Sequence, residues 1–367
     1  MKTNLSSLIS MIGAALLASA PVNAQTYTVN TINPPAGTYA CVGQGLNNSG
    51  QVVGYTTIQV GTGKKSTIVR GPAFIWENGQ SASLPPLSGE SSAEATGISD
   101  TGLAIGGRYL SEEGRATWWE NTSSGYQPRD WNDLLPPGSG VTLLRADSIS
   151  HDGQYVSFQA DIGVGELRDI VAQIQLDAAG QWPVEIIAFW DVTSVWGVTA
   201  IHHDGAGLVR AAGLTGPDMD TPEAFRWLKA PDGSTEFTDL HSYMDSDTGA
   251  WAINGFGEVA GDRRNSSGRR AVCWHQDGTM QDIGTLGGTY STANSINDGG
   301  MIVGWASTKG KGKNDGPVRA FLWDGAVMVD LNTRIASSLV LTQARRINNA
   351  GQILARSGST SVLLTPQ

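Results

Sequence analysis

The chain has 367 residues, a formal net charge of −10 at pH 7 and only 16% charged residues. This acidic balance argues against nucleic-acid binding, which calls for a basic surface. The two cysteines, Cys41 and Cys273, are too few for the disulfide framework of a small secreted domain. Stability must therefore come from a packed core.

The first 24 residues have the pattern of a secretory signal peptide. Lys2 supplies the positive start, an apolar run extends from Leu8 to about Ala20, and Ala24 stands at the expected cleavage position. The run is too short to span a bilayer, and no comparable run follows it. We therefore predict a mature chain of residues 25–367, without an integral membrane segment, that is exported to the periplasm or the medium.

The mature chain repeats one pattern, an apolar anchor residue followed four positions later by glycine. The steps between successive anchors are 52, 51, 52, 52, 43 and 51 residues, a spacing typical of propellers and other repeat arrays. The anchors are Leu46, Ile98, Ile149, Ile201, Ile253, Ile296 and Ile347, and the glycines are Gly50, Gly102, Gly153, Gly205, Gly257, Gly300 and Gly351.

Each repeat unit predicts four short antiparallel strands, A to D. A turn-forming residue after the anchor and a glycine suited to positive φ predict a tight hairpin between strands A and B. Strand A has a small residue three positions before the anchor in six of the seven units, which lets strands crowd near an axis. Strand C contains the sequences AFIW, ATWW, AFRW, AVCW and AFLW, and a short turn leads from it to strand D.

Seven such units predict an all-β fold, a seven-bladed β-propeller of four-stranded antiparallel blades that forms a single domain over residues 25–367. The last unit ends in SVLLTPQ without a strand D, while TYTVNTI precedes the first strand A. We therefore expect the N-terminal strand, residues 26–32, to join the last blade beside residues 361–365 and close the ring. An open solenoid is the alternative, but it requires polar caps that the sequence lacks.

The run AVCWHQDGTMQDIGTLGGTYSTANSINDGGMIVGW, residues 271–305, resembles the HAF-repeat extracellular proteins of bacteria. The resemblance covers nearly the whole mature chain and is strongest in units five and six. It implies export and a propeller-forming repeat architecture, and it brings no catalytic motif. A histidine often precedes the Ala-Phe pair in that family, whereas the position here holds Pro72, Arg115, Glu223, Arg270 and Arg319.

The longest connections, between strands B and C and between strands D and A, are expected on one face, where binding residues concentrate. Basic residues of the B to C connections can attract an anionic ligand, although solvated loop charges are the alternative. Tryptophans that do not repeat can stack on sugars, with plain packing as the alternative. The predicted ligand-binding residues are Arg115, Arg264, Arg319, Trp190, Trp196, Trp251 and Trp305. The repeating tryptophans Trp76, Trp119, Trp227, Trp274 and Trp323 are expected in the core.

One segment, DLHSYMDSD, offers a candidate acid/base pair in His241 and Tyr243. With Arg270 neutralising a uronate carboxylate, either side chain could remove the neighbouring proton, as in a polysaccharide lyase. His275 begins the turn after strand C and is interpreted as structural. The sequence shows no cofactor motif and no paired metal ligands, so we expect neither a cofactor nor a metal.

Three functions remain open. The first is a monomeric binding module that recognises a glycan or another extracellular or cell-surface ligand on the long-loop face. The second is a polysaccharide lyase or hydrolase acting on an acidic glycan, and the third is a structural scaffold for protein interaction. Cys41 and Cys273 belong to units that lie across the ring, beyond the roughly 7 Å that a disulfide can bridge, so we predict two free thiols.

Overall fold

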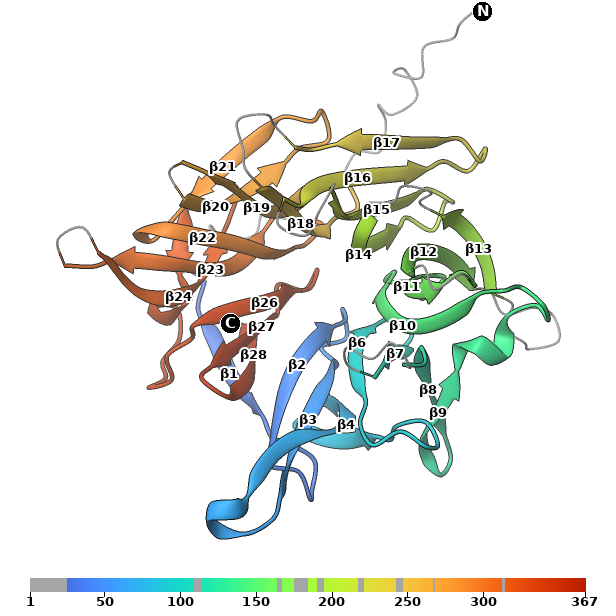
Figure 1. Cartoon of the computed structure of the whole chain (residues 1–367). Helices are drawn as coiled ribbons and strands as arrows, with labels where there is room; N and C mark the ends of the chain where they lie inside the picture. The colour runs from blue at the N-terminus through green and yellow to red at the C-terminus, as the bar shows by residue number, and fades with distance from the viewer. Residues whose placement is uncertain are drawn as a thin grey trace, which may run out of the picture.

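The computed structural model describes residues 25–108, 114–163, 167–174, 184–189, 195–216, 221–241, 247–266, 268–311 and 314–367. These residues form antiparallel β-strands arranged around a central axis (Figure 1), with three short 3-10 turns at Gly63–Lys65, Trp131–Leu134 and Leu331–Thr333. Among the described residues, no helix is long and apolar enough to cross a membrane. The predicted signal peptide lies outside the described residues.

Five sheets have four strands each. They are β2 (Ala40–Leu46), β3 (Val52–Val60), β4 (Thr67–Glu77) and β5 (Gln80–Leu84); β14 (Val195–His203), β15 (Val209–Thr215), β16 (Glu223–Lys229) and β17 (Thr235–Asp239); β18 (Asp247–Ile253), β19 (Val259–Asn265), β20 (Gly268–Trp274) and β21 (Met280–Gly284); β22 (Gly287–Ile296), β23 (Ile302–Lys309), β24 (Asp315–Trp323) and β25 (Met328–Asp330); and β26 (Gln343–Ile347), β27 (Ile353–Ser357) and β28 (Thr360–Pro366) with β1 (Tyr27–Ile32).

The expectation of seven separate blades is wrong. The structure has five four-stranded blades, and the other eight strands form one continuous sheet. These strands are β6 (Glu94–Ile98), β7 (Ala104–Gly107), β8 (Thr117–Thr122), β9 (Gly125–Asp130), β10 (Thr142–Ile149), β11 (Tyr155–Asp161), β12 (Leu167–Ile174) and β13 (Val184–Phe189).

A close backbone approach joins the two halves of the eight-stranded sheet. Gly107 of β7 pairs with Arg145 of β10. A Cβ atom on Gly107 would lie 3.4 Å from the Arg145 Cα atom and 3.0 Å from the Arg115 carbonyl oxygen. Because glycine has no side chain, β10 can come within pairing distance of β7, and two units that the repeat pattern separates become one sheet.

The N-terminal strand closes the ring. Strand β1 pairs with β28 in antiparallel register, with Thr31 opposite Val362 and Ile32 opposite Ser361. The two ends of the chain therefore share one sheet (Figure 1), which confirms the predicted pairing. A closed ring leaves no open end at which the first and last units expose their apolar faces.

The hairpin turns have the predicted backbone conformation, since all seven repeat glycines have φ between 73° and 83°. In the first unit, the Asn47 side chain accepts a hydrogen bond from the Gln51 N–H (2.9 Å) and donates one to the Ser99 carbonyl of the next unit (2.9 Å). The same donation runs from Asn254 to the Asn297 carbonyl, from Asn297 to the Asn348 carbonyl, and from Asn348 to the Asn47 carbonyl. Buried turn asparagines thus link neighbouring units.

Strand B packs tightly against strand A at a shared glycine. A Cβ atom on Gly304 would lie 2.0 Å from the Thr292 carbonyl oxygen. A Cβ atom would lie equally close, at 1.9–2.0 Å, to a carbonyl oxygen of strand A at four other glycines: Gly54, Gly106, Gly213 and Gly261. The five repeating tryptophans of strand C are at most 5% exposed, which confirms their prediction as core residues.

Replacing Gly304 by alanine tests the close packing of strands A and B. A new Cβ atom would collide with backbone that cannot move alone, so we expect Gly304→Ala to lower the free energy of unfolding by at least about 3 kcal/mol. Gly278→Ala is the control, because Gly278 has φ of 84° and open space around a Cβ atom. Its left-handed backbone should cost only about 1–2 kcal/mol. Denaturant unfolding measures both variants, and equal losses would contradict the packing argument.

Candidate functional site

The first strand of every repeat unit carries a β-bulge at the residue two positions before the anchor. A bulged residue has no partner on the neighbouring strand, and its side chain is turned away from the regular alternation. All seven bulged residues line one cavity at the centre of the ring: Gln44, Thr96, Asp147, Thr199, Trp251, Asn294 and Arg345. A fold-wide backbone irregularity therefore builds the site.

The central cavity has a volume of about 510 Å³ and a largely polar lining. Its size is within the range of pockets that hold small molecules, roughly 300–1,000 Å³. A second cavity of about 110 Å³ continues toward the hairpin turns and is lined by the apolar anchors, Leu46, Ile98, Ile149, Ile201, Ile253, Ile296 and Ile347. Polar side chains, among them Asp147, His151 and Arg346, also line this second cavity, so the central space narrows toward the hairpin turns without becoming apolar.

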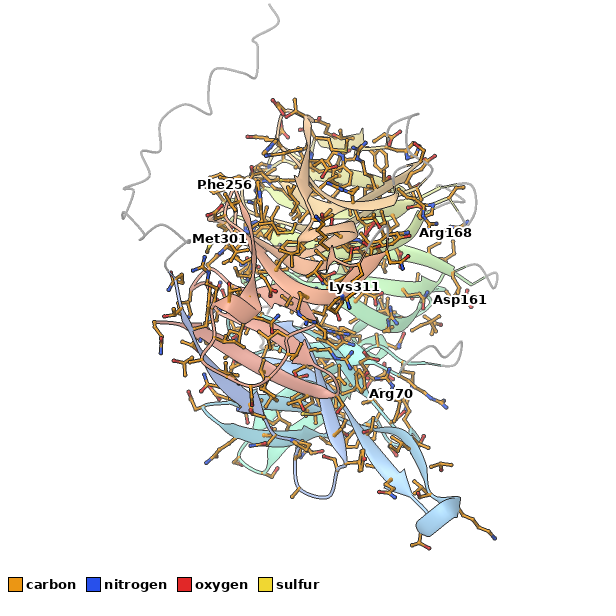
Figure 2. All side chains as sticks on the ribbon, turned by 90° about the vertical axis from the view of Figure 1, so that its left-hand side faces the viewer. Arg70, Asp161, Arg168, Phe256, Met301 and Lys311 are labelled. Atoms are coloured by element: carbon orange, nitrogen blue, oxygen red, sulfur yellow. The ribbon has the colours of Figure 1, made fainter. Side chains whose placement is uncertain are left out.

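The two faces of the ring differ in what they carry. Viewed edge-on in Figure 2, Phe256 and Met301 of the A to B hairpin turns lie on one side. On the other side lie Arg70 and Arg168, near the start of strands β4 and β12, and Asp161, at the end of strand β11. The 510 Å³ cavity uses residues at and before the bulge of strand A, so it lies toward the second of these faces. The sequence places its longest connections there.

One wall of the cavity is acidic. The Arg145 Nε atom donates to Asp147 Oδ1 at 2.6 Å. Asp169 of β12 lies nearby and accepts a hydrogen bond from the Val198 backbone N–H. Burial, and after it the nearby Asp147 carboxylate, raise the pKa of Asp169 to about 8, against the opposing effect of Arg145. Asp169 is therefore mostly protonated at neutral pH and can donate a hydrogen bond into the cavity.

Two adjacent arginines of β26 form the basic wall. Arg345 Nη1 donates to Gln44 Oε1, and Arg346 Nη1 donates to the Arg345 carbonyl at 3.3 Å. In the part of the chain that the structure describes, neither guanidinium forms an ion pair, and Arg345 Nε has no hydrogen-bond partner. Burial and the neighbouring Arg345 charge lower the pKa of Arg346 to about 10, so it stays charged at neutral pH.

Trp251 is the predicted ligand-binding residue that the structure places in the cavity. Its indole N–H donates to Asp262 Oδ2 at 3.1 Å, and Arg269 pairs with the other oxygen of Asp262 at 2.7 Å. Asp262 itself is 1% exposed. These contacts hold the indole edge against the sheet, so the ring has a defined orientation at the cavity wall.

The predicted loop arginines make their own contacts outside the cavity lining. Arg115 lies 3.3 Å from Asp130 and 3.6 Å from Glu90, Arg264 lies 3.5 Å from Asp247, and Arg319 donates to the Val318 carbonyl at 3.1 Å. Trp305 is partly buried on β23, away from the lining. Trp190 and the side chain of Trp196 lie outside the described residues, so their role stays a prediction.

The predicted catalytic residues are held by separate partners. His241 Nδ1 lies 3.3 Å from Thr248 Oγ1, and Arg270 Nη2 lies 3.2 Å from Asp282 Oδ1. Neither side chain lines the central cavity, and Tyr243 lies outside the described residues. The two cysteines are free, as predicted, and both are buried. Burial raises the pKa of Cys41 to about 11 and that of Cys273 to about 12, so both are thiols at neutral pH.

Sequence reasoning missed most of the cavity residues: Arg145, Asp147, Asp169, Arg345 and Arg346. Six of the seven bulged residues are polar, although they interrupt strands that are otherwise small or apolar near the axis. This column of polar residues, at a fixed position before the anchor, is the signal that could have identified the cavity. Asp169 gives no such signal, because it lies on β12, the third strand of its unit, and not on a first strand.

No protein-family model matches the chain, and no curated protein matches it. The matching solved structures include TolB from Acinetobacter baumannii, with a TM-score of 0.42 and 13% identity over 86% of this chain and 80% of that one. They also include the acylaminoacyl peptidase of Pyrococcus horikoshii, with a TM-score of 0.39 and 13% identity over 69% of this chain and 40% of that one. Scores this low carry no functional argument, and the resemblance to HAF-repeat proteins stays a prediction.

Asp169→Asn tests the protonated carboxyl of the cavity. Between the ordinary pKa of 3.8 and the folded pKa of about 8, folded Asp169 holds a proton that the unfolded chain has released. The stability that the tightly held Asp169 proton contributes is fully present below pH 3.8. As pH rises toward 8, the free energy of unfolding falls by up to about 1.4 kcal/mol per pH unit. We therefore expect the variant to lose less stability than wild type from about pH 5 to about pH 8 in thermal unfolding. The exposed Glu236→Gln should follow wild type. Parallel profiles for Asp169→Asn and wild type would contradict the assignment.

Proposed function

We propose that the protein is an exported binding module whose central cavity holds the acidic end of a glycan. The observation that carries the proposal is the pair of cavity arginines, Arg345 and Arg346, neither of which forms an ion pair among the described residues. The Glu94 carboxylate acts on Arg345 only from beyond ion-pair distance. Both side chains are partly buried, and a partly buried cation without an ion-pair partner is stabilised when a ligand supplies the opposite charge. The export part of the proposal rests on the predicted signal peptide.

The charge of the cavity favours an anion. Three arginines and three carboxyl groups line it: Arg145, Arg345, Arg346, Glu94, Asp147 and Asp169. Because Asp169 has a pKa of about 8, it is mostly neutral at pH 7, which leaves the arginines in excess by about one charge. A carboxylate can also accept two parallel hydrogen bonds from one guanidinium, which fixes its orientation.

The remaining lining suits a sugar. Trp251 brings an aromatic surface with a fixed edge, and such surfaces pack against the apolar face of a sugar ring. Gln44, Thr96 and Asn294 add hydrogen-bonding groups for hydroxyls. A uronic acid carries both features, a carboxylate and a ring of hydroxyls, within a volume that the cavity can accommodate.

Binding of uronate oligosaccharides tests the proposal. We expect oligogalacturonides or oligoalginates to bind at least about 10-fold more tightly than neutral oligosaccharides of the same length, a difference of about 1.4 kcal/mol. Arg346→Gln and Trp251→Leu should each weaken uronate binding by at least about 10-fold, because each removes a direct contact. Isothermal titration calorimetry measures the affinities.

Arg319→Gln is the matched control, because it removes an arginine from the long-loop face and leaves the cavity intact. If Arg319→Gln weakens binding and Arg346→Gln does not, the ligand lies on the loop face rather than in the cavity. Equal affinity for uronate and neutral oligosaccharides would refute the acidic-glycan part of the proposal.

One observation favours hydrolysis of the same glycan as a second candidate function. Asp147 and Asp169 both lie in the cavity, and burial raises the pKa of both carboxyl groups. Asp169 is mostly protonated at neutral pH, whereas the neighbouring Arg145 favours the ionised form of Asp147. A protonated carboxylic acid beside an ionised carboxylate is the arrangement that glycosidases use for acid and base catalysis.

Prolonged incubation with the oligosaccharide that binds best separates binding from hydrolysis. A hydrolase should release reducing ends, and Asp169→Asn should abolish that release while the glycan still binds, because the amide keeps the shape but has no acidic proton. New products with a double bond would indicate a lyase instead. Binding of the intact glycan without any product would exclude both reactions.

A further inference from the structure

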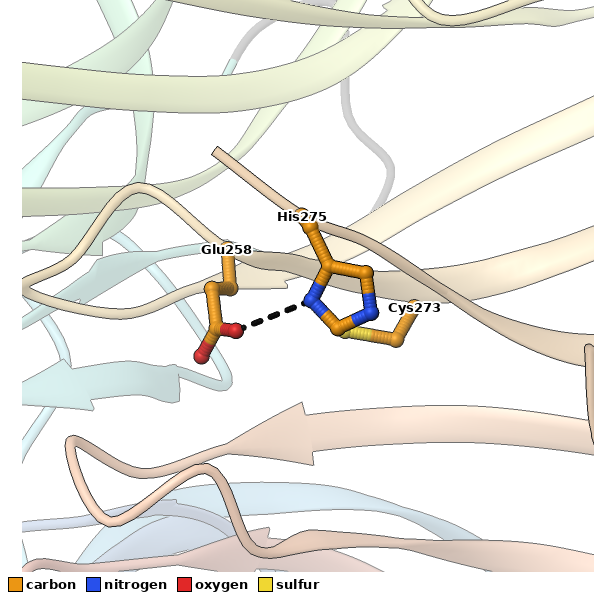
Figure 3. A group of neighbouring side chains, drawn as sticks. All are labelled: Glu258, Cys273 and His275. Atoms are coloured by element: carbon orange, nitrogen blue, oxygen red, sulfur yellow. Dashed lines mark hydrogen bonds and ion pairs between the residues drawn. The ribbon is translucent and has the colours of Figure 1, made fainter. Parts of the chain in front are cut away.

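Three potential metal ligands lie together on the sheet of β18–β21, outside the lining of the central cavity (Figure 3). Glu258 directly precedes β19, Cys273 lies within β20, and His275 follows it. One ligand atom from each residue lies within 4.8 Å of the other two. Glu258 Oε1 and His275 Nδ1 lie 3.1 Å apart.

Neighbouring side chains orient Glu258 and His275 by hydrogen bonds, as residues around known metal ligands do. His275 Nδ1 donates to Glu258 Oε1 at 3.1 Å, and Nε2 lies 3.1 Å from Gln281 Oε1. When a metal binds, Nε2 can keep its proton and donate to Gln281, while the metal replaces the proton on Nδ1, which is released to solvent. The Asn254 side chain donates to Glu258 Oε2 at 2.9 Å, which leaves Oε1 facing the histidine. Metal-binding histidines and carboxylates are generally oriented by such second partners.

The repeat architecture does not require the trio. Gln51 and Gln352 occupy the position of Glu258, and their Oε1 atoms accept the same bond from a turn asparagine, at 2.6 Å and 2.8 Å. Leu322 occupies the position of Cys273, and Asp324 that of His275. Only the unit of β18–β21 combines a carboxylate, a thiol and an imidazole at these three positions.

We propose that Glu258 Oε1, Cys273 Sγ and His275 Nδ1 bind a divalent transition metal of the zinc class. A thiolate, an imidazole and a carboxylate form a ligand set that suits Zn²⁺, and three protein ligands leave a fourth position for water. On binding, the Cys273 thiol releases its proton to solvent, because the thiolate is the ligand. This site goes beyond the sequence prediction, which assigned His275 a structural role and expected no metal.

The metal can reach the site from its solvent side. The side chains of His275 and Glu258 are 36% and 24% exposed, whereas Cys273 is 1% exposed. An ion would first meet the imidazole and the carboxylate and then bind the buried sulfur. The sulfur would lie on the protein side of the metal, away from competing thiols in solution.

Titration of the full chain with Co²⁺, a spectroscopic substitute for Zn²⁺, tests the site. We expect one equivalent of Co²⁺ to produce a thiolate-to-cobalt charge-transfer band together with the visible bands of four-coordinate cobalt. Added Zn²⁺ should displace the cobalt and remove both. Failure of the wild-type protein to give the charge-transfer band would overturn the proposal.

Variants that borrow the residue found at the same position of another repeat unit are expected to keep the fold. Cys273→Leu should remove the charge-transfer band, and Glu258→Gln and His275→Asp should each weaken Co²⁺ binding by at least about 10-fold. Cys41→Ser is the matched control, because it changes the other buried thiol, and it should bind Co²⁺ as wild type does. Circular dichroism confirms folding of each variant. A band that persists in Cys273→Leu, or disappears in Cys41→Ser, would refute the assignment of the ligands.

Discussion

The bulge near the end of each first strand is the constraint on which the rest of the structure depends. The first strands of the seven units come close to one axis. Along a regular strand, side chains point alternately to the two faces of the sheet, so small residues such as Ala95 and Ala344 and their polar neighbours would point to opposite faces. The bulge frees one residue per strand from pairing and turns it toward the axis. The small residues remain packed between units, and the centre of the ring becomes a polar chamber.

A second set of interactions keeps that chamber in shape. Turn asparagines bond from one unit to the carbonyl of the next, and the chain from Asn254 through Asn297 and Asn348 to Asn47 crosses the point of ring closure. Each of these amides is buried, and a buried amide left without a partner would cost about 1–3 kcal/mol. These bonds hold the hairpin face together at the four units that carry a turn asparagine.

Both proposed sites follow one rule of this architecture. Every unit has a bulge and a turn glycine at fixed positions, and five of the seven have a core tryptophan, but no single residue type occupies the bulge itself in all units. Arg345 and Asp147 occupy bulge positions, and the proposed metal ligands replace residues such as Gln352 that serve only the turn. Chemistry thus enters where the repeat tolerates variation, so that a site can form without disturbing the core.

The sequence by itself determined the strand order, the turn glycines, the core tryptophans and the pairing of the two chain ends, because these features depend on local backbone conformation, side-chain size and a missing last strand. Only the tertiary structure decided that β7 and β10 join two units into one sheet, because pairing there depends on how closely Gly107 and Arg145 approach. It also decided which side chains share the cavity. Arg345 meets Gln44 across 301 residues of chain, and the pKa of Asp169 depends on burial and on neighbours that no local pattern specifies.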